Sequence, residues 1–371
     1  MKIWLDITDP KYALFLSPLI SELKKSNELL ITSRQDSAYS ELASIFELLG
    51  IDAFYIGKHG GANILDKFKA RLYRQNEFLN IFKKTFLPDL LITGASVEAA
   101  QCAFGCGIKI IHFADTPLAG NSLDKSLYTK VARLSLGLSD IIFHPFVVPK
   151  EAFLNLGLKE SQVICQDFID VALWLWDLGE DIFNNKIDHQ KRAEFCKKLG
   201  LDPDGPIILA REEEFKAHYV GKKYSLFYDA LKELKDYQII LMPRYEIAPL
   251  LEEFNSFKNI RILSEKLLPR EFYPFVDLLI GGGGTMNLEA AFLGIPVISV
   301  RSLLLFHDVH LMQNNLMHHA KTTNDVVHLA SILLKNARSA RSDNRAIFFK
   351  NRQIYKPNFD FASEAILSQK R

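Results

Sequence analysis

Residues 275–300 read FVDLLIGGGGTMNLEAAFLGIPVISV. A short apolar run ends in four consecutive glycines and is followed by apolar positions at helical spacing and then by a second apolar run. This order predicts a strand, a glycine turn, a helix and a further strand. Glycine costs backbone entropy, and before a helix its usual use is to bring backbone N–H groups close to an anion. We therefore predict that this segment binds a phosphate group.

Two side chains beside the glycine turn suit a nucleotide. Thr285 can cap the helix and donate its hydroxyl to a phosphate, and Glu289, one turn later on the same helix face, can accept from ribose hydroxyls. The alternative is a tight strand-to-helix turn that binds nothing, which the offsets of these two residues disfavour. The residues expected at the diphosphate are Gly282, Gly283, Gly284, Thr285 and Met286.

Strands alternate with helices along the chain. Apolar runs at residues 2–7, 29–32 and 89–93 are separated by segments of helical spacing, and the same holds for the runs at 207–210 and 238–242. Such alternation predicts doubly wound parallel sheets, in which ligands gather at the carboxyl ends of the strands. Since 371 residues exceed what one core usually supports, we predict two Rossmann-like α/β domains.

The first domain is placed at residues 1–166 and the second at 191–347, with a connector at 167–190. A hydrophobic content of 48% and a net charge of +1 are ordinary for a soluble protein and lack the basic excess of a nucleic-acid-binding protein. We find no signal-peptide core and no window as long as a membrane span, so we expect a cytoplasmic protein. The four cysteines are too scattered for a metal site.

Two predicted strands of the second domain end in arginine. Arg211 follows the strand at 207–210, and Arg244 follows the strand at 238–242. An arginine at this edge, facing a glycine-rich helix start, can hold a diphosphate through paired hydrogen bonds. Either arginine could instead form a surface ion pair with a neighbouring glutamate.

Three titratable side chains are candidates for proton transfer in the first domain. Asp9 and Asp115 follow predicted strands, and His59 lies in the glycine-rich turn at 57–61. Each could take the proton of an acceptor hydroxyl. For His59, a surface position in a flexible loop is equally compatible with the sequence.

Residues 58–84 carry seven basic and two acidic residues, a net charge of +5, with aromatic and aliphatic residues between them. A basic amphipathic helix of this kind can lie on an anionic membrane surface, which would suit a lipid-linked acceptor. The commoner arrangement is a solvated helix whose apolar face packs on the sheet. Contact of residues 58–86 with the inner face of a membrane is the second possibility.

The glycine-turn segment, GGGGTMNLEAAFLGIPVIS, resembles the nucleotide-binding segment of the second domain in GT-B sugar-nucleotide enzymes. These include glycosyltransferases and the non-hydrolysing UDP-GlcNAc 2-epimerases. The segments MKIWLDITDP, IGKHGGANIL and RQDSAYSELASIFELLGI are similar to an uncharacterised bacterial and archaeal family of that superfamily. The resemblance covers almost the whole chain. It implies two domains facing across a cleft, with a helix at 348–371 that returns to the first domain.

The resemblance also implies roles for particular residues. It puts Arg211 at a phosphate contact, which ranks it above Arg244. It places His307 and Asp308 near the donor sugar, in a loop that precedes a helix expected at residues 311–320.

The sequence bears on which reaction this fold would carry. The epimerases have a His-x-Glu-Ala-Gly motif whose glutamate moves a proton, and the matching residues 112–116 have Ala114 at that position. A second epimerase acid is missing from residues 127–129, and Ala210 stands where a histidine would precede the arginine. These departures argue against epimerase chemistry, although Asp115 could substitute for the lost glutamate.

Glycosyl transfer asks less of the protein, because the donor must be held, the leaving diphosphate stabilised and one proton taken. The resemblance therefore implies a metal-independent glycosyltransferase that uses a UDP-sugar or similar donor and a glycan or lipid-linked acceptor, in surface polysaccharide or glycoconjugate synthesis. A sugar-nucleotide epimerase and a non-catalytic nucleotide-sugar-binding protein are the alternatives.

Overall fold

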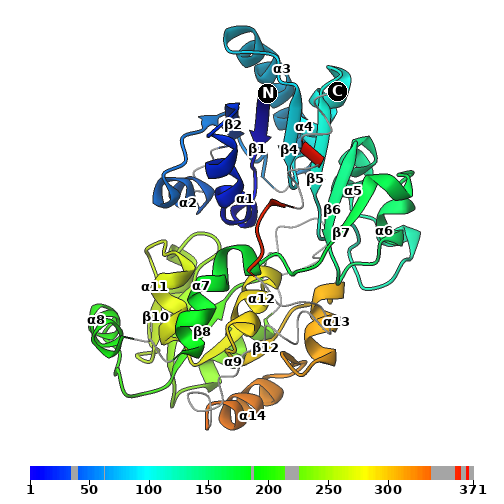
Figure 1. The fold of residues 1–371 in the computed structure, drawn as a ribbon. Helices are drawn as coiled ribbons and strands as arrows, with labels where there is room; N and C mark the ends of the chain where they lie inside the picture. Colours follow the sequence, from blue (N-terminus) through cyan, green and yellow to red (C-terminus); the bar gives the residue numbers. More distant parts are fainter. Residues whose placement is uncertain are drawn as a thin grey trace. The chain divides into compact units, whose positions relative to one another are not determined.

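In the computed structural model, the chain forms two compact units (Figure 1). The first contains Met1–Leu173 and Lys356–Arg371, and the second contains Trp174–Tyr355. Each unit has one parallel sheet flanked by helices, so the prediction of two Rossmann-like α/β domains is confirmed. The structure describes residues 1–34, 41–61, 63–184, 188–213, 225–335, 356–360 and 365–366.

The sheet of the first unit has seven strands in the order β3-β2-β1-β4-β5-β6-β7. The strands are β1 (Lys2–Asp6), β2 (Glu28–Ser33), β3 (Phe54–Tyr55), β4 (Leu90–Thr93), β5 (Lys109–Phe113), β6 (Ile141–Pro145) and β7 (Val163–Gln166). The order changes direction between β1 and β4, where Asp6 pairs with Thr93. The carboxyl ends of these two strands therefore form the topological switch point of the first sheet.

Aromatic side chains attach helices to both faces of this sheet. The helices are α1 (Pro10–Leu23), α2 (Glu41–Leu49), α3 (Ile64–Lys84), α4 (Val97–Gly105), α5 (Lys130–Ser135) and α6 (Glu151–Leu154). On one face, Trp4 of β1 packs against Phe78 of α3. On the other face, Phe15 of α1 packs against Phe113 of β5, and Phe359 contacts both rings. The chain thus returns to the first unit at Phe359, while most of the helix expected at 348–371 lies outside the described residues.

The second unit has a six-stranded parallel sheet in the order β10-β9-β8-β11-β12-β13. Its strands are β8 (Ile207–Arg211), β9 (Gln238–Met242), β10 (Ile260–Ile262), β11 (Leu278–Gly281), β12 (Val297–Ser299) and β13 (His318–His319). The remaining helices are α7 (Ala172–Phe183), α8 (His189–Leu199), α9 (Leu226–Glu233), α10 (Ala248–Phe254), α11 (Pro269–Phe272), α12 (Gly284–Phe292), α13 (Phe306–Gln313) and α14 (Thr323–Leu333). The switch point of this sheet lies between β8 and β11.

The prediction of a helix at residues 311–320 is wrong in its bounds. The chain becomes helical earlier, because the Asp308 carboxylate accepts from the Leu305 N–H at 2.8 Å and so closes the first turn of α13. The last part of the expected helix instead forms the edge strand β13, which pairs with β12. His307 and Asp308 therefore lie on a helix and not in a loop. The expected connector at 167–190 contains the whole of α7, which begins at Ala172.

Candidate functional site

Arg211 and the glycine turn meet at the switch point of the second sheet. β8 and β11 are parallel, with Gly281 opposite Arg211 in the register. The N–H of Gly282 donates to the carbonyl oxygen of Arg211 at 2.9 Å. Two segments that lie about 70 residues apart in sequence thus share one sheet edge, where doubly wound sheets bind their ligands.

Close packing requires glycine at two positions of the turn. A Cβ on Gly281 would lie 1.8 Å from the side-chain oxygen of an asparagine in α12, and a Cβ on Gly282 would lie 2.5 Å from the backbone nitrogen of Glu213. At Gly283, by contrast, the nearest atom to a Cβ would be Cγ of Arg211 at 3.9 Å. The first two glycines are needed to build the turn, whereas a Cβ on the third would make only ordinary van der Waals contact.

This difference predicts that alanine destabilises the protein at position 282 and is tolerated at position 283. Gly282→Ala is expected to lower the free energy of unfolding by about 1–3 kcal/mol, because the Glu213 backbone must move. Gly283→Ala is expected to change it by no more than about 0.5 kcal/mol, since the φ of −107° at Gly283 suits alanine. Urea unfolding of the two variants checks this. Equal losses of stability would contradict the conclusion that close packing requires glycine at 282 but not at 283.

The start of α12 carries no side-chain cap. Gly283 is its N-cap residue and makes no capping hydrogen bond, so the prediction that Thr285 caps the helix is wrong. Thr285 is the second residue of the helix, because β11 extends to Gly281 and α12 already begins at Gly284. The first backbone N–H groups of an uncapped helix carry partial positive charge and bind anions well. Thr285 and Met286 both lie in this first turn.

Arg301 lies over the same helix start and was not among the arginines predicted to hold the diphosphate. A Cβ on Gly284 would be 3.0 Å from Nη1 of Arg301. The buried Nε of Arg301 has no hydrogen-bond partner within the described part of the chain. The available signal was its place directly after a strand of the second domain, the same position that singled out Arg211. The Arg301 guanidinium and the Cγ of Arg211 therefore both lie beside the turn that begins α12.

Asp308 holds Arg301 in place. Its carboxylate forms an ion pair with Nη1 of Arg301, and both side chains are buried. The prediction had put Asp308 and His307 beside the donor sugar. In the structure, His307 is buried in the first turn of α13, next to Asp308. In the structure, Asp308 therefore contacts Arg301, which belongs to the candidate anion site.

Glu289 is buried and accepts two hydrogen bonds from the protein. Its Oε1 accepts from Trp174 Nε1 at 2.8 Å, and its Oε2 accepts from the Tyr273 hydroxyl at 2.7 Å. Burial, together with the charge of Glu289, raises the pKa of Tyr273 well above its ordinary value. A ribose hydroxyl at Glu289 would have to share the carboxylate with these two donors.

The loop after β9 is tied to the loop after β8. Nη1 of Arg211 donates to the carbonyl oxygen of Pro243 at 2.7 Å, and the backbone N–H of Arg244 donates to Glu212 Oε2 at 3.0 Å. Glu212 also accepts from the Tyr228 hydroxyl. These contacts fix the backbone that carries both predicted arginines at the same sheet edge as the glycine turn.

In the first unit, Asp115 belongs to a cluster of buried charges. Nζ of Lys11 lies 2.5 Å from Asp115 Oδ2 and forms a second ion pair with Asp170. Burial alone would lower the pKa of Lys11, but the two carboxylates outweigh it and hold the pKa above its ordinary value. The side chain of Asp115 is 23% exposed and that of Asp170 is 6% exposed. Asp115 is therefore the more accessible of the two carboxylates.

Asp9 and His59 have structural surroundings of their own. Asp9 is the N-cap of α1, and its Oδ1 accepts from the N–H of Lys11 at 2.9 Å. His59 is partly buried in the turn that packs against α3. Gly60 in this turn has a φ of +82°, and a Cβ there would lie 2.8 Å from the Cα of Lys67. Close packing against α3 therefore accounts for Gly60, and no bound ligand is needed to explain why this position is a glycine.

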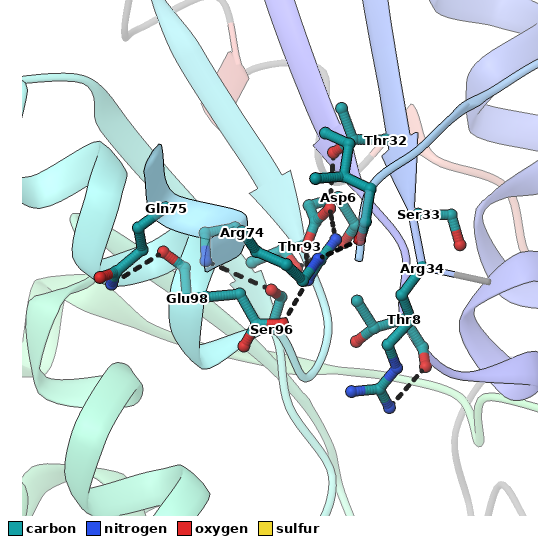
Figure 2. Close-up of polar contacts among 12 residues, drawn as sticks. Asp6, Thr8, Thr32, Ser33, Arg34, Arg74, Gln75, Thr93, Ser96 and Glu98 are labelled. Carbon is teal, nitrogen blue, oxygen red and sulfur yellow. Dashed lines mark hydrogen bonds and ion pairs between the residues drawn. The ribbon is translucent and has the colours of Figure 1, made fainter. Parts of the chain in front are cut away.

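The switch point of the first sheet is filled by buried ion pairs (Figure 2). Arg74 of α3 donates from Nη2 to Asp6 Oδ1 at 2.8 Å and from Nη1 to Asp6 Oδ2 at 3.3 Å. It also pairs with Glu98 of α4. Burial alone would raise the pKa of Glu98, but the charges of Arg74 and Arg34 outweigh it, so the pKa is lowered.

The burial of Arg74 corrects the charge count for residues 58–84. The sequence analysis treated all seven basic residues of this segment as solvated, but Arg74 is fully buried. Its two partners are carboxylates, so its charge is neutralised inside the unit. The remaining net charge of the segment is +4, from six basic and two acidic residues.

Within the described residues, no group of three or more histidine, cysteine, aspartate or glutamate side chains is arranged to hold a metal ion. The helices described here also include none with the length and apolar character needed to cross a bilayer.

The fold of the chain is similar to that of several solved structures. UDP-GlcNAc 2-epimerase from Neisseria meningitidis, solved with UDP-GlcNAc bound, matches with a TM-score of 0.73 and 17% identity over 100% of this chain and 99% of that one. Anabaena Alr3699/HepE, solved in complex with UDP-glucose, matches with a TM-score of 0.62 and 11% identity over 100% and 99%. At these identities the likeness shows the fold alone.

In sequence, the chain is 26% identical over 345 residues to an uncharacterised protein of Methanocaldococcus jannaschii, covering 91% of this chain and 92% of that protein. The family described as "Protein of unknown function (DUF354)" matches residues 1–354. The chain therefore belongs to the DUF354 family.

Proposed function

We propose that the chain binds a nucleotide-sugar with its diphosphate at the start of α12 and transfers the sugar to an acceptor hydroxyl. The observation that carries this proposal is the uncapped start of α12, which lies beside the side chains of Arg211 and Arg301. Backbone N–H groups and two arginines complement a diphosphate in charge and geometry. That the two similar structures hold UDP-GlcNAc and UDP-glucose supports a UDP-sugar as the donor.

The same groups suit the chemistry of glycosyl transfer. The acceptor oxygen would bond to the anomeric carbon, and the bond from that carbon to the diphosphate would break with its electrons on the leaving group. The diphosphate gains negative charge in this step, and groups already fixed around it stabilise that charge. The acceptor proton would pass to a carboxylate, for which Asp115 is the first candidate and Asp9 the second. The proposed acceptor is a glycan or a lipid-linked sugar, as in surface polysaccharide synthesis.

A sugar-nucleotide epimerase is the second candidate. It is favoured by the solved structures with this fold that are UDP-GlcNAc 2-epimerases, such as the one from Neisseria meningitidis. Ala114 and Ala210 argue against it, because the resemblance places them where the epimerases have a glutamate that moves a proton and a histidine that precedes the arginine. A protein that binds nucleotide-sugars without converting them is consistent with the same replacements.

Calorimetric titration with UDP, GDP, CMP and dTDP tests the binding site. We expect one of these nucleotides to bind the wild type, and Arg301→Lys and Thr285→Ala each to weaken that binding by about 1–3 kcal/mol, because a hydrogen bond to a charged group is lost. The control is Arg270→Lys, on the exposed side of α11, which should bind like the wild type. Failure of the wild type to bind any of the four would sink the proposal.

Product analysis separates the reactions. Incubation of the bound UDP-sugar with the enzyme alone should leave it intact, and release of UDP should require an acceptor. Conversion of the donor into a second sugar nucleotide without an acceptor would establish the epimerase instead. Binding with neither outcome would establish a non-catalytic protein.

A further inference from the structure

The exposed hydrophobic side chains of the protein are concentrated in one short segment. Of the fifteen large hydrophobic side chains that the described residues expose, nine fall between residues 54 and 87. Most of them belong to α3, the long helix at the top of Figure 1. They are Ile64, Leu65, Phe68, Leu72, Tyr73 and Leu79. Single exposed apolar residues are ordinary, but a contiguous group of this kind marks an interaction surface.

The exposed residues form a stripe along α3. Leu65, Phe68, Leu72 and Leu79 recur at intervals of three, four and seven residues, which places them on one side of a helix. Their exposed fractions are 69%, 55%, 51% and 42%. Phe78 is buried against Trp4 of the sheet, so α3 has a second apolar side that the fold already uses. We call Leu65, Phe68, Leu72 and Leu79 the outer stripe of α3.

Basic residues surround the outer stripe. With Arg74 neutralised inside the unit, α3 carries five other basic residues, all exposed or partly exposed, and two acidic ones, a net charge of +3. The basic residues are Lys67, Lys69, Arg71, Lys83 and Lys84. Long basic side chains beside exposed leucine and phenylalanine are typical of helices that lie in the interface of an anionic bilayer.

We propose that the outer stripe of α3 docks on an anionic phospholipid membrane. The apolar side chains would enter the interface between head groups and acyl chains, while the lysine ammonium groups contact lipid phosphates. A second copy of the chain fits this surface less well, because two-fold pairing of the stripes would bring two helices of net charge +3 together. The proposal does not depend on which reaction the second unit supports.

Sedimentation with lipid vesicles tests the proposal on the full chain, without nucleotide. We expect binding to vesicles that contain phosphatidylglycerol, little binding to pure phosphatidylcholine, and a decrease as salt is added. The double variant Leu65→Ser/Phe68→Ser should lose binding at least tenfold. The matched control is Leu251→Ser, which alters a residue of α10 that is 56% exposed, and it should bind like the wild type.

Thermal unfolding of each variant shows whether it remains folded. We expect each variant to fold, because the substituted side chains are exposed. Absence of wild-type binding to anionic vesicles would overturn the proposal. So would equal loss of binding in Leu251→Ser. A dimer in light scattering that the outer-stripe variant converts to a monomer, together with no vesicle binding, would assign the surface to a second copy of the chain instead.

Discussion

Arg74→Met is expected to lower the free energy of unfolding by about 3–5 kcal/mol, because it leaves buried carboxylates without a counter-charge. Asp6 and Glu98 are both buried and both pair with this guanidinium, as Figure 2 shows. Methionine fills much of the volume of the arginine stem, so the loss reports charge more than cavity formation. Urea unfolding at pH 7 measures the difference.

The pH dependence of this loss is a check on its cause. Glu98 has a lowered pKa in the folded protein, against an ordinary value of 4.5. Its ionised form therefore stabilises the fold above about pH 4.5, and this contribution is lost as the pH falls through the lower, folded-state pKa. The gap between wild type and Arg74→Met should accordingly shrink in acid. Lys69→Met removes an exposed partner of Asp66 and should leave stability almost unchanged. A loss in Arg74→Met as small as that in Lys69→Met would contradict our account.

Lys11→Met is expected to have an effect of similar size, about 3–5 kcal/mol, for the same physical reason. One ammonium group serves both Asp115 and Asp170, and without it two carboxylates of like charge would remain close together. Chemical unfolding of Lys11→Met beside Lys109→Met measures the effect. Lys109 pairs with Asp140 at the surface, so its removal should cost far less.

Two further variants divide the roles of the carboxylates in this cluster. Asp115→Asn keeps the buried pair of Lys11 with Asp170, so it should retain the fold and lose turnover if Asp115 is the base. Asp170→Asn should lose stability more than Asp115→Asn does, because Asp170 is the more buried partner. If Lys11→Met proved as stable as Lys109→Met, our account of the cluster would be wrong. Water would then have to solvate the carboxylates of Asp115 and Asp170 in the native protein.

The sequence predicted the architecture because local patterns specify it. The apolar run before four glycines ends a parallel strand in any doubly wound sheet, and β11 and α12 lie there. The position of Arg211 at a strand end also predicted that it would share an edge with the glycine turn, as the register confirms. Both features depend on neighbours within a few residues, which a sequence displays directly.

Contacts between distant residues explain what the sequence could not predict. A charge count over α3 takes Arg74 as solvated, because no residue near it in sequence indicates that it pairs with Asp6 and Glu98. Arg301 was not predicted to lie at the diphosphate, because its position over Gly284 appears only when β12 and α12 are folded together. The edge strand β13 was taken for helix because its two histidines carry no alternation of apolar and polar residues.

The two sheets repeat one strand order, so the chain contains two sheet edges of the kind at which such folds bind ligands. In the first unit, the arginine at that edge is saturated by internal carboxylates, and an incoming phosphate would have to displace them. In the second unit, an uncapped helix start lies at the equivalent edge beside the side chains of Arg211 and Arg301, and Arg301 pairs with a single carboxylate, Asp308. We therefore expect one bound nucleotide per chain, because two internal carboxylates already neutralise Arg74 at the edge of the first sheet.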